Sequence, residues 1–225
     1  MTDTKPATRK PKIGLLPVGH FYYWDQFPQL RDKGLGMYKK LRRELEKIGT
    51  VEAPELVDTA EKAQKAASFF QEKEIDILLV FPFGYTPSMC VIPAVQNVDV
   101  PLRILNAHEN SSYDYRRADT TEYLHHEGVC CVPEISGALV GTGRKFRVIT
   151  GHFGEPRMWD EVRADCLGAA AARTFRSLNI GLIGEIYTNM SDMPVDEHRL
   201  LRTTGRLLVR PEVEEIDEAY KRVTD

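Results

Sequence analysis

The stretch Ile75-Asp-Ile-Leu-Leu-Val-Phe81 decides the fold of this chain. It is apolar throughout, apart from Asp76, and it has the length of a single β-strand. An unbroken apolar run of that length is typical of a strand in a parallel sheet, because helices cover both faces of such a sheet and neither face meets water. The sequence therefore predicts a parallel sheet between two layers of helices.

Outward from this strand, the chain alternates between strand-like and helix-like segments. The other predicted strands are residues 12–19, 50–57, 102–105, 146–150 and 179–186. Apolar residues recur at helical spacing in residues 29–48, 60–72, 89–95, 129–142, 158–178 and 212–223. This alternation predicts a doubly wound parallel sheet with right-handed crossovers, a Rossmann- or flavodoxin-like three-layer sandwich.

The same pattern suggests a division of the chain. We expect a disordered lead-in over residues 1–11, an N-terminal α/β domain over residues 12–178, and the start of a second α/β unit over residues 179–225. No closing strand follows the last predicted helix, so the second unit is incomplete. A small tail helix is one interpretation; the one that we prefer is that the chain is the front part of a longer protein.

Composition excludes several classes of protein. The chain has 225 residues, 42% of them hydrophobic and 28% charged, and its formal net charge is −3. A basic footprint for nucleic acid or for an anionic membrane is therefore absent from the sequence. The first 12 residues lack the apolar core of a signal peptide, and no later apolar stretch reaches membrane-spanning length. We expect a cytoplasmic protein without nucleic-acid or membrane partners.

Four cysteines raise the question of a metal site. Cys130 and Cys131 follow His125 and His126 directly, but no C-x-x-C pair occurs, and the side chains of neighbouring residues diverge. We therefore interpret the thiols as buried small hydrophobic groups in a reducing compartment, and we expect no metal ligands in this chain. The sequence also lacks a P-loop, a G-x-G-x-x-G fingerprint and a G-x-S-x-G elbow.

Polar and aromatic residues follow the predicted strands. They include His20 to Trp24 after the first strand, Phe83 to Pro87 after the third, Asn106 to His126 after the fourth, His152 after the fifth, and Glu185 to Met190 after the sixth. The carboxyl ends of parallel strands share one sheet edge, where ligands bind. A carbohydrate site needs flat apolar surfaces for sugar C–H groups and side chains that form hydrogen bonds with hydroxyls. Aromatic rings together with His, Asn and Glu provide both. Each residue also has a plain structural interpretation, such as packing under a loop for His20.

The order of these motifs resembles the L-arabinose isomerase and L-fucose isomerase family, especially its arabinose-isomerase-like branch. The resemblance covers nearly all of the chain and rests on a series of individually loose motifs. They are Gly19-His-Phe-Tyr22, Phe83-Gly-Tyr-Thr-Pro-Ser-Met89, Val100-Pro-Leu-Arg-Ile-Leu-Asn106, His126-Glu-Gly128 with Gly137-Ala138, Val148-Ile-Thr-Gly-His152, and the segment from Ile183 to Asp196.

This resemblance implies a function. The family interconverts aldoses and ketoses with a divalent metal, typically Mn²⁺, and two carboxylates that move protons. Its metal-binding Glu and His residues belong to later domains. The chain would then be the substrate-pocket and assembly part of a homo-oligomeric isomerase of carbohydrate metabolism, inactive without a C-terminal half. No catalytic residue and no Mn²⁺ site are expected in this chain.

The resemblance also implies substrate-binding residues at subunit junctions. Position by position these are His20, Tyr22, Tyr85, His126 and Met190, and the local spacing leaves His125 as the alternative to His126. Gly19 stands where arabinose isomerases carry glutamine, which argues against L-arabinose itself as the sugar. Two other functions stay open: a stand-alone sugar-binding or regulatory module, and a structural assembly domain without a ligand.

Overall fold

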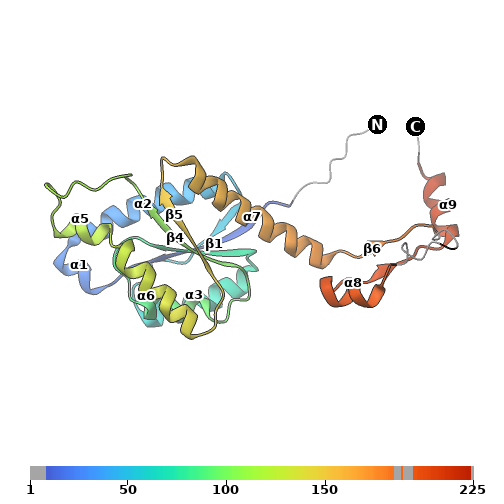
Figure 1. Cartoon of the computed structure of the whole chain (residues 1–225), viewed down its shortest axis with the longest axis horizontal. Coiled ribbons are helices and arrows are strands. Elements are labelled where there is room, and N and C mark those ends of the chain that lie inside the picture. Colours follow the sequence, from blue (N-terminus) through green and yellow to red (C-terminus); the bar gives the residue numbers. More distant parts are fainter. Residues whose placement is uncertain (1–8, 185–188, 190–194, 224–225) are drawn as a thin grey trace. The chain divides into compact units, whose positions relative to one another are not determined.

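The computed structural model describes residues 9–184, 189 and 195–223 (Figure 1). The chain forms two compact units, one of them Arg9–Ala170 and the other including Ala171–Asp225. We call these the main unit and the second unit. The division falls inside one long helix, α7, which spans Pro156–Ser177.

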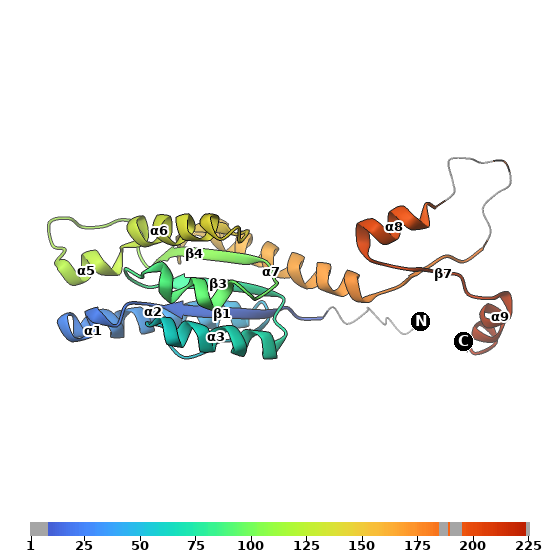
Figure 2. The ribbon, with the colours of Figure 1, turned by 90° about the horizontal axis from the view of Figure 1, so that it is seen from below.

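The main unit contains a five-stranded, all-parallel sheet, as the apolar strand predicts. Its strands are β1 (Lys12–Val18), β2 (Thr50–Glu52), β3 (Ile77–Pro82), β4 (Leu102–His108) and β5 (Arg147–His152). Their order in the sheet is β2-β1-β3-β4-β5, which is the flavodoxin-like order. The predicted α/β class and doubly wound sheet are therefore confirmed. Figure 2 shows β1, β3 and β4 running side by side.

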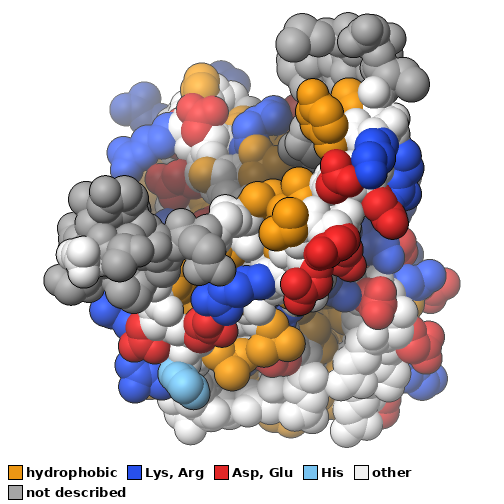
Figure 3. Space-filling view, turned by 90° about the vertical axis from the view of Figure 1, so that its right-hand side faces the viewer, with side chains coloured by type: hydrophobic (Ala, Val, Ile, Leu, Met, Phe, Trp, Pro, Cys, Tyr) orange, Lys and Arg blue, Asp and Glu red, His pale blue; other side chains and the backbone are white. Residues whose placement is uncertain are grey.

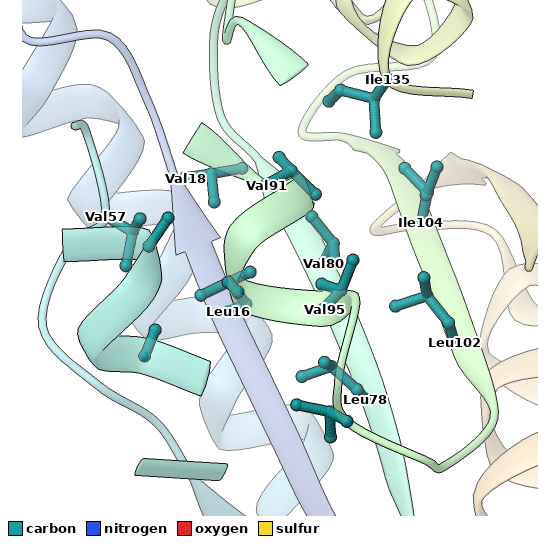
Figure 4. Packing of buried hydrophobic residues seen from close by; sticks show 14 of the residues in the cluster. Leu16, Val18, Val57, Leu78, Val80, Val91, Val95, Leu102, Ile104 and Ile135 are labelled. Atoms are coloured by element: carbon teal, nitrogen blue, oxygen red, sulfur yellow. The ribbon is translucent and has the colours of Figure 1, made fainter. Parts of the chain in front are cut away.

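Helices cover both faces of this sheet. In the main unit they are α1 (Tyr22–Gln26), α2 (Pro28–Glu46), α3 (Ala60–Lys73), η1 (Ser88–Cys90), α4 (Ile92–Val95), α5 (Thr120–His125), α6 (Gly128–Gly141) and most of α7. One buried cluster joins α3, α4 and α6 to the sheet, and Figure 4 shows its strand residues, including Leu16, Val80 and Ile104. The other cluster joins α2 and α7 to the opposite face. The result is the predicted three-layer sandwich.

Local sequence explains where the first long helices begin. Pro28 occupies the first turn of α2, where its missing N–H is not needed, and Leu30, Met37, Leu41 and Leu45 form the buried face of that helix. Thr59 caps α3, because its hydroxyl accepts a hydrogen bond of 3.3 Å from the backbone N–H of Lys62.

The one polar residue of the deciding stretch lies at the amino end of the sheet. Asp76 is buried, and its carboxylate accepts hydrogen bonds of 2.9 Å from Arg9 Nη1 and 2.8 Å from the backbone N–H of Lys12. Because a buried carboxylate needs donors, these bonds explain how a charge is tolerated beside an apolar strand.

Two expectations about strands are wrong, and two short helices were missed. The second strand ends at Glu52 and resumes only as an isolated bridge between Val57 and Val18, because Pro54, which lacks an N–H, intervenes. The short helices α1 and α5 were not predicted. Within the described residues of the predicted sixth strand, only Ile180–Gly181 form a strand, β6, and it pairs with β7 (Leu208–Val209) in a separate two-stranded sheet.

The second unit contains one β-α-β motif. The helix α8 (Glu197–Thr204) connects β6 to its parallel neighbour β7, and α9 (Val213–Lys221) follows. Asp196 caps α8 by accepting a hydrogen bond of 2.9 Å from the backbone N–H of Arg199, and Gly205 ends that helix with a left-handed conformation.

Candidate functional site at the carboxyl edge of the sheet

The strand order creates a switch point between β1 and β3. The chain leaves β1 toward β2 on one side and returns through β3 on the other, so the connections after β1 and β3 diverge. The carboxyl ends of these strands are neighbours, because Val18 is paired with Pro82 in the register. In open α/β sheets the crevice outside such a switch point is where ligands bind.

Two predicted site residues meet at this switch point. His20 follows β1 and Tyr85 follows β3, and their ring centroids lie 6.3 Å apart. Tyr23, which was not among the predicted residues, completes a triangle with them, at 5.2 Å from the ring of His20 and 6.2 Å from that of Tyr85. We call His20, Tyr23 and Tyr85 the switch-point cluster.

Tyr22 belongs to the rim of this cluster. Its ring contacts His20 edge to face at 5.1 Å and lies 4.0 Å from the ring of Phe21, while 62% of the residue is exposed. An exposed tyrosine ring beside a histidine offers a flat apolar surface and a hydroxyl to an approaching ligand.

The backbone at the end of β1 is held closely. A Cβ on Gly19 would lie 2.8 Å from the ring of Trp24, and Trp24 Nε1 donates a hydrogen bond of 2.8 Å to Asp58. Lys62 donates a second bond of 2.6 Å to the same carboxylate. These contacts fix the turn that carries His20, and they explain why this position holds glycine.

Burial disfavours the charged forms of His20 and Tyr23 in the switch-point cluster. It lowers the pKa of His20, an effect that the nearby Asp58 carboxylate partly opposes. Burial also raises the pKa of Tyr23, with further contributions from Tyr85 and from the carboxylate of Glu127. Nδ1 of His20 is buried and has no hydrogen-bond partner among the described residues, so this nitrogen can still form a hydrogen bond with a ligand.

A second group of rings follows β4. His126 lies 5.7 Å from His108 and 5.5 Å from Tyr113, measured between ring centroids. These rings line a cleft of about 250 Å³ together with Asn110, Ser111, Ser112, Tyr115, Tyr123 and Val129. His108 is held in place by a hydrogen bond of 3.0 Å between its Nε2 and Asn106 Oδ1. We call this the β4 cleft.

The structure separates the two neighbouring histidines. His126 lines the β4 cleft and bonds through Nε2 to Glu122 Oε1 at 3.1 Å, while Lys33 donates a bond of 2.7 Å to the other oxygen of Glu122. His125 is buried instead, and burial lowers its pKa to about 4, with a smaller effect from His126. His126 is therefore the histidine that faces the cleft.

Glu127 is a buried carboxylate that sequence reasoning missed as a site residue. It is only 4% exposed, and its Oε1 has no hydrogen-bond partner among the residues that the structure describes. Desolvation is the main cause of the raised pKa values of Tyr23 and Tyr113, and the charge of Glu127 adds to both; a hydrogen bond to Glu127 is the main cause of the raised pKa of Tyr123. It thus influences both the switch-point cluster and the β4 cleft. Its position in the motif His126-Glu-Gly128 was the available signal.

Met190, the remaining predicted site residue, lies outside the described residues. The described part of the predicted sixth strand, β6, pairs with β7, so the expectation that it is a further strand of the five-stranded sheet is wrong. Of the predicted residues, the structure thus brings His20, Tyr22 and Tyr85 together, and it places His126 in the adjoining β4 cleft.

The thiols differ in their surroundings. Cys90, Cys131 and Cys166 are buried, and burial raises their pKa values to about 11, 12 and 12 respectively. Cys130 is exposed, so the interpretation of all four as buried groups is wrong for this residue. Within residues 9–184, 189 and 195–223, no group of three or more His, Cys, Asp or Glu side chains is placed to hold a metal ion.

Comparison with known proteins adds no family assignment. No protein-family model matches the chain, and no curated protein matches it. Among the described residues, no helix is both long and apolar enough to cross a membrane.

Proposed function

We propose that this chain forms the sugar-binding and assembly domain of a metal-dependent aldose–ketose isomerase. The observation that carries the proposal is the approach of His20 and Tyr85 to 6.3 Å at the switch point of the sheet. The motif series in the sequence supports the same assignment, since both residues belong to motifs that resemble the arabinose-isomerase-like branch.

The chemistry of the site supports a neutral polyhydroxylated ligand. Rings of Tyr22, Tyr23 and Tyr85 offer apolar faces to sugar C–H groups, and their hydroxyls can bind sugar hydroxyls. His20, whose lowered pKa favours the neutral ring, offers one donor and one acceptor. The neighbouring β4 cleft adds His126 and its hydrogen-bonded Glu122.

In the proposed enzyme, the residues of the switch-point cluster and of the β4 cleft bind and orient the sugar. Mn²⁺ supplies polarisation of the substrate oxygens in this family. The described residues of this chain do not fit a metal site, so no step of the reaction is assigned to them. The metal ligands and proton-transferring carboxylates would come from protein outside this part of the chain.

Binding by the isolated chain tests the site. Aldopentoses and 6-deoxyhexoses are titrated by calorimetry or by ligand-observed NMR against the wild type and against the double variant Tyr22→Ala/Tyr85→Ala. We expect the double variant to bind at least about tenfold more weakly, which corresponds to about 1.4 kcal/mol. Tyr220→Ala is the matched control, because Tyr220 is 78% exposed and lies in the second unit. Equal binding by wild type and double variant would remove the proposed site.

A stand-alone sugar-binding or regulatory module is the second candidate. It is favoured by the two buried clusters of the main unit, which contains the entire switch-point cluster and its own core. The intact mass of the protein in its native extract separates the two candidates. A mass well above 25.6 kDa, together with Mn²⁺-dependent ketose formation, favours the isomerase. A mass of 25.6 kDa with metal-independent sugar binding favours the module.

A further inference from the structure

The β4 cleft contains a histidine that is held by a carboxylate. Nε2 of His126 bonds to Glu122 Oε1 at 3.1 Å, across one turn of the chain at α5. Lys33, which belongs to α2, donates a hydrogen bond of 2.7 Å to the other oxygen of Glu122. Asp119 caps α5 by accepting a hydrogen bond of 2.8 Å from the backbone N–H of Glu122. Glu122 is thus fixed by two elements, and it fixes the ring of His126.

The state of Glu122 decides which nitrogen of His126 carries the proton. The hydrogen bond from Lys33 is the main cause of the lowered pKa of Glu122; burial opposes this effect, and His126 adds to it. Because an ionised carboxylate only accepts hydrogen bonds, Nε2 of His126 is the donor and carries the proton. Nδ1 of the neutral ring then keeps its lone pair, and it has no hydrogen-bond partner among the described residues. A histidine held in this way can act as a general base.

The ring of His126 lies where a ligand can reach it. It lines the β4 cleft, and 15% of its side chain is exposed. The ring of Tyr113 meets it edge to face, with centroids 5.5 Å apart, and Tyr113 lines the same cleft. Burial, with a smaller effect from His126, lowers the pKa of the neighbouring His108 and so disfavours a second positive charge there. The cleft therefore combines a basic imidazole nitrogen with a phenol.

Glu127 connects this cleft to the switch-point cluster. The charge of this buried carboxylate acts on Tyr23 of the cluster, and it acts on Tyr113 and Tyr123 of the cleft. The two sets of rings are therefore close enough to share one ligand. A pyranose whose ring face lies on the tyrosines of the cluster can place its anomeric carbon in the cleft.

We propose that the β4 cleft opens the ring of an aldopyranose, with His126 as the catalytic base. This inference rests on the proposed function, because it requires that the switch-point cluster bind a sugar. Aldoses are cyclic in water, whereas conversion to a ketose requires the open-chain carbonyl. Ring opening is a separate reaction that needs no metal, and its reversal interconverts the two anomers. The sequence predicted no catalytic residue in this chain, and the pair of His126 and Glu122 supplies one.

The proposed reaction is balanced within the cleft. The proton of the anomeric hydroxyl moves to Nδ1 of His126 while the carbonyl forms at the anomeric carbon. The bond from that carbon to the ring oxygen breaks, its electron pair stays on the ring oxygen, and this oxygen takes the proton of the Tyr113 hydroxyl. The imidazolium then returns its proton to the Tyr113 oxygen, so both residues regain their first state. Glu122 stabilises the charged ring and Lys33 holds Glu122, which makes these two positioning residues.

Polarimetry of the full chain tests the proposal. L-Fucose and D-xylose are dissolved as single anomers, and their approach to anomeric equilibrium is followed with and without protein. The wild type should accelerate this approach at least about tenfold, and EDTA should leave the acceleration unchanged. His126→Gln should lower kcat, measured at saturating sugar, about a hundredfold, which is a typical contribution of a general base. Tyr113→Phe should lower kcat about tenfold, because it removes the donor to the ring oxygen.

Variants of Glu122 distinguish positioning from a structural role. Glu122→Gln keeps an acceptor for Nε2 but removes the negative charge. It should lower kcat about tenfold and change the sugar dissociation constant less than about twofold. Glu122→Asp, which restores the charge, should recover part of the lost kcat. A purely structural role would change kcat and the dissociation constant together.

Matched controls come from the second unit. His198→Gln and Tyr220→Ala remove an exposed histidine and an exposed tyrosine, and the helices that carry these residues bury none of their residues. Figure 3 shows hydrophobic side chains lying at the surface beside acidic and basic ones. Substitutions at such exposed positions have little effect on folding, so both controls should keep the wild-type rate.

Three results would overturn the proposal. They are a sugar that is bound but equilibrates at the buffer rate, a kcat that His126→Gln leaves unchanged, and an acceleration that EDTA abolishes. Calorimetry on the same samples separates this inference from the proposed function: binding without acceleration removes only the role of His126, whereas absence of binding removes both. Circular dichroism checks the fold of each variant. Should His126→Gln fail to fold, Glu122→Gln still decides the question, because the side chain of Glu122 is 31% exposed.

Discussion

The main unit and the second unit are both built from β-α-β segments, but among the described residues only the main unit has a buried core. In the main unit, five parallel strands are covered on both faces by two buried clusters. In the second unit, two short strands pair in parallel, and α8 and α9 bury nothing. The comparison teaches that amphipathic patterning is sufficient for local structure, whereas a core requires enough neighbouring elements to exclude water from both faces of a sheet.

The largest expected difference concerns leucines in the two units. Leu41 is fully buried in α2, so Leu41→Ala should lower the free energy of unfolding by about 3 kcal/mol, from lost burial and the cavity left behind. Leu201→Ala, at a residue 44% exposed, should change it by less than about 0.5 kcal/mol in the monomer. Urea unfolding at low protein concentration measures both. Equal costs would contradict the contrast between the units.

Acid should destabilise the main unit by protonating His125. Because burial lowers its pKa from 6.5 to about 4, the fold favours the neutral ring. The neutral His125 ring therefore stabilises the fold fully above pH 6.5. As the pH falls from 6.5 toward 4, the free energy of unfolding decreases by about 3 kcal/mol in total. Glu122 and Glu109 oppose this effect, while His126 and Lys33 reinforce it.

The unfolding free energy measured between pH 7 and pH 4 checks this slope. His125→Gln should flatten it, because glutamine does not titrate. His198→Gln, at an exposed residue of the second unit, is the control. An identical slope in wild type and His125→Gln would show that another group controls the acid sensitivity.

Arg144 connects helix and loop backbone in the main unit. Its guanidinium donates hydrogen bonds to the carbonyls of Val98 at 2.7 Å and Val100 at 2.6 Å, and a longer one of 3.3 Å to that of Val95. Arg144→Met should lower the free energy of unfolding by about 2 kcal/mol, because these carbonyls lose their donor. Thermal unfolding measures the change, and Arg163→Met, at an exposed residue, should be nearly neutral.

Two glycines of α2 provide the finest comparison. A Cβ on Gly34 would overlap the ring of Phe83, whereas a Cβ on Gly36 would meet nothing within 4 Å. Gly36→Ala should therefore raise the free energy of unfolding by up to about 1 kcal/mol, from better helix propensity. Gly34→Ala should lower it by about 1 kcal/mol, since the ring must move. Changes of the same sign in both variants would contradict the packing of α2 against Phe83.

Part of the candidate site followed from the sequence. The strand pattern placed His20 and Tyr85 among the residues expected at one sheet edge, and the family resemblance singled them out as substrate-binding residues. The approach of Tyr23 to both, and the burial of Glu127, were not predictable, because they depend on the turn into α1 and on the start of α6. The sixth strand was misplaced, since an apolar run does not reveal which sheet it joins.

The sequence by itself determined the α/β class, the long helices and the apolar strands, because these depend on periodicity and length within one segment. Only the tertiary structure decided the order β2-β1-β3-β4-β5, and with it the switch point where His20 meets Tyr85. It also decided that His126 faces the β4 cleft while His125 is buried. Strand neighbours and side-chain burial depend on packing between segments that are distant in the sequence. Local periodicity therefore does not predict them.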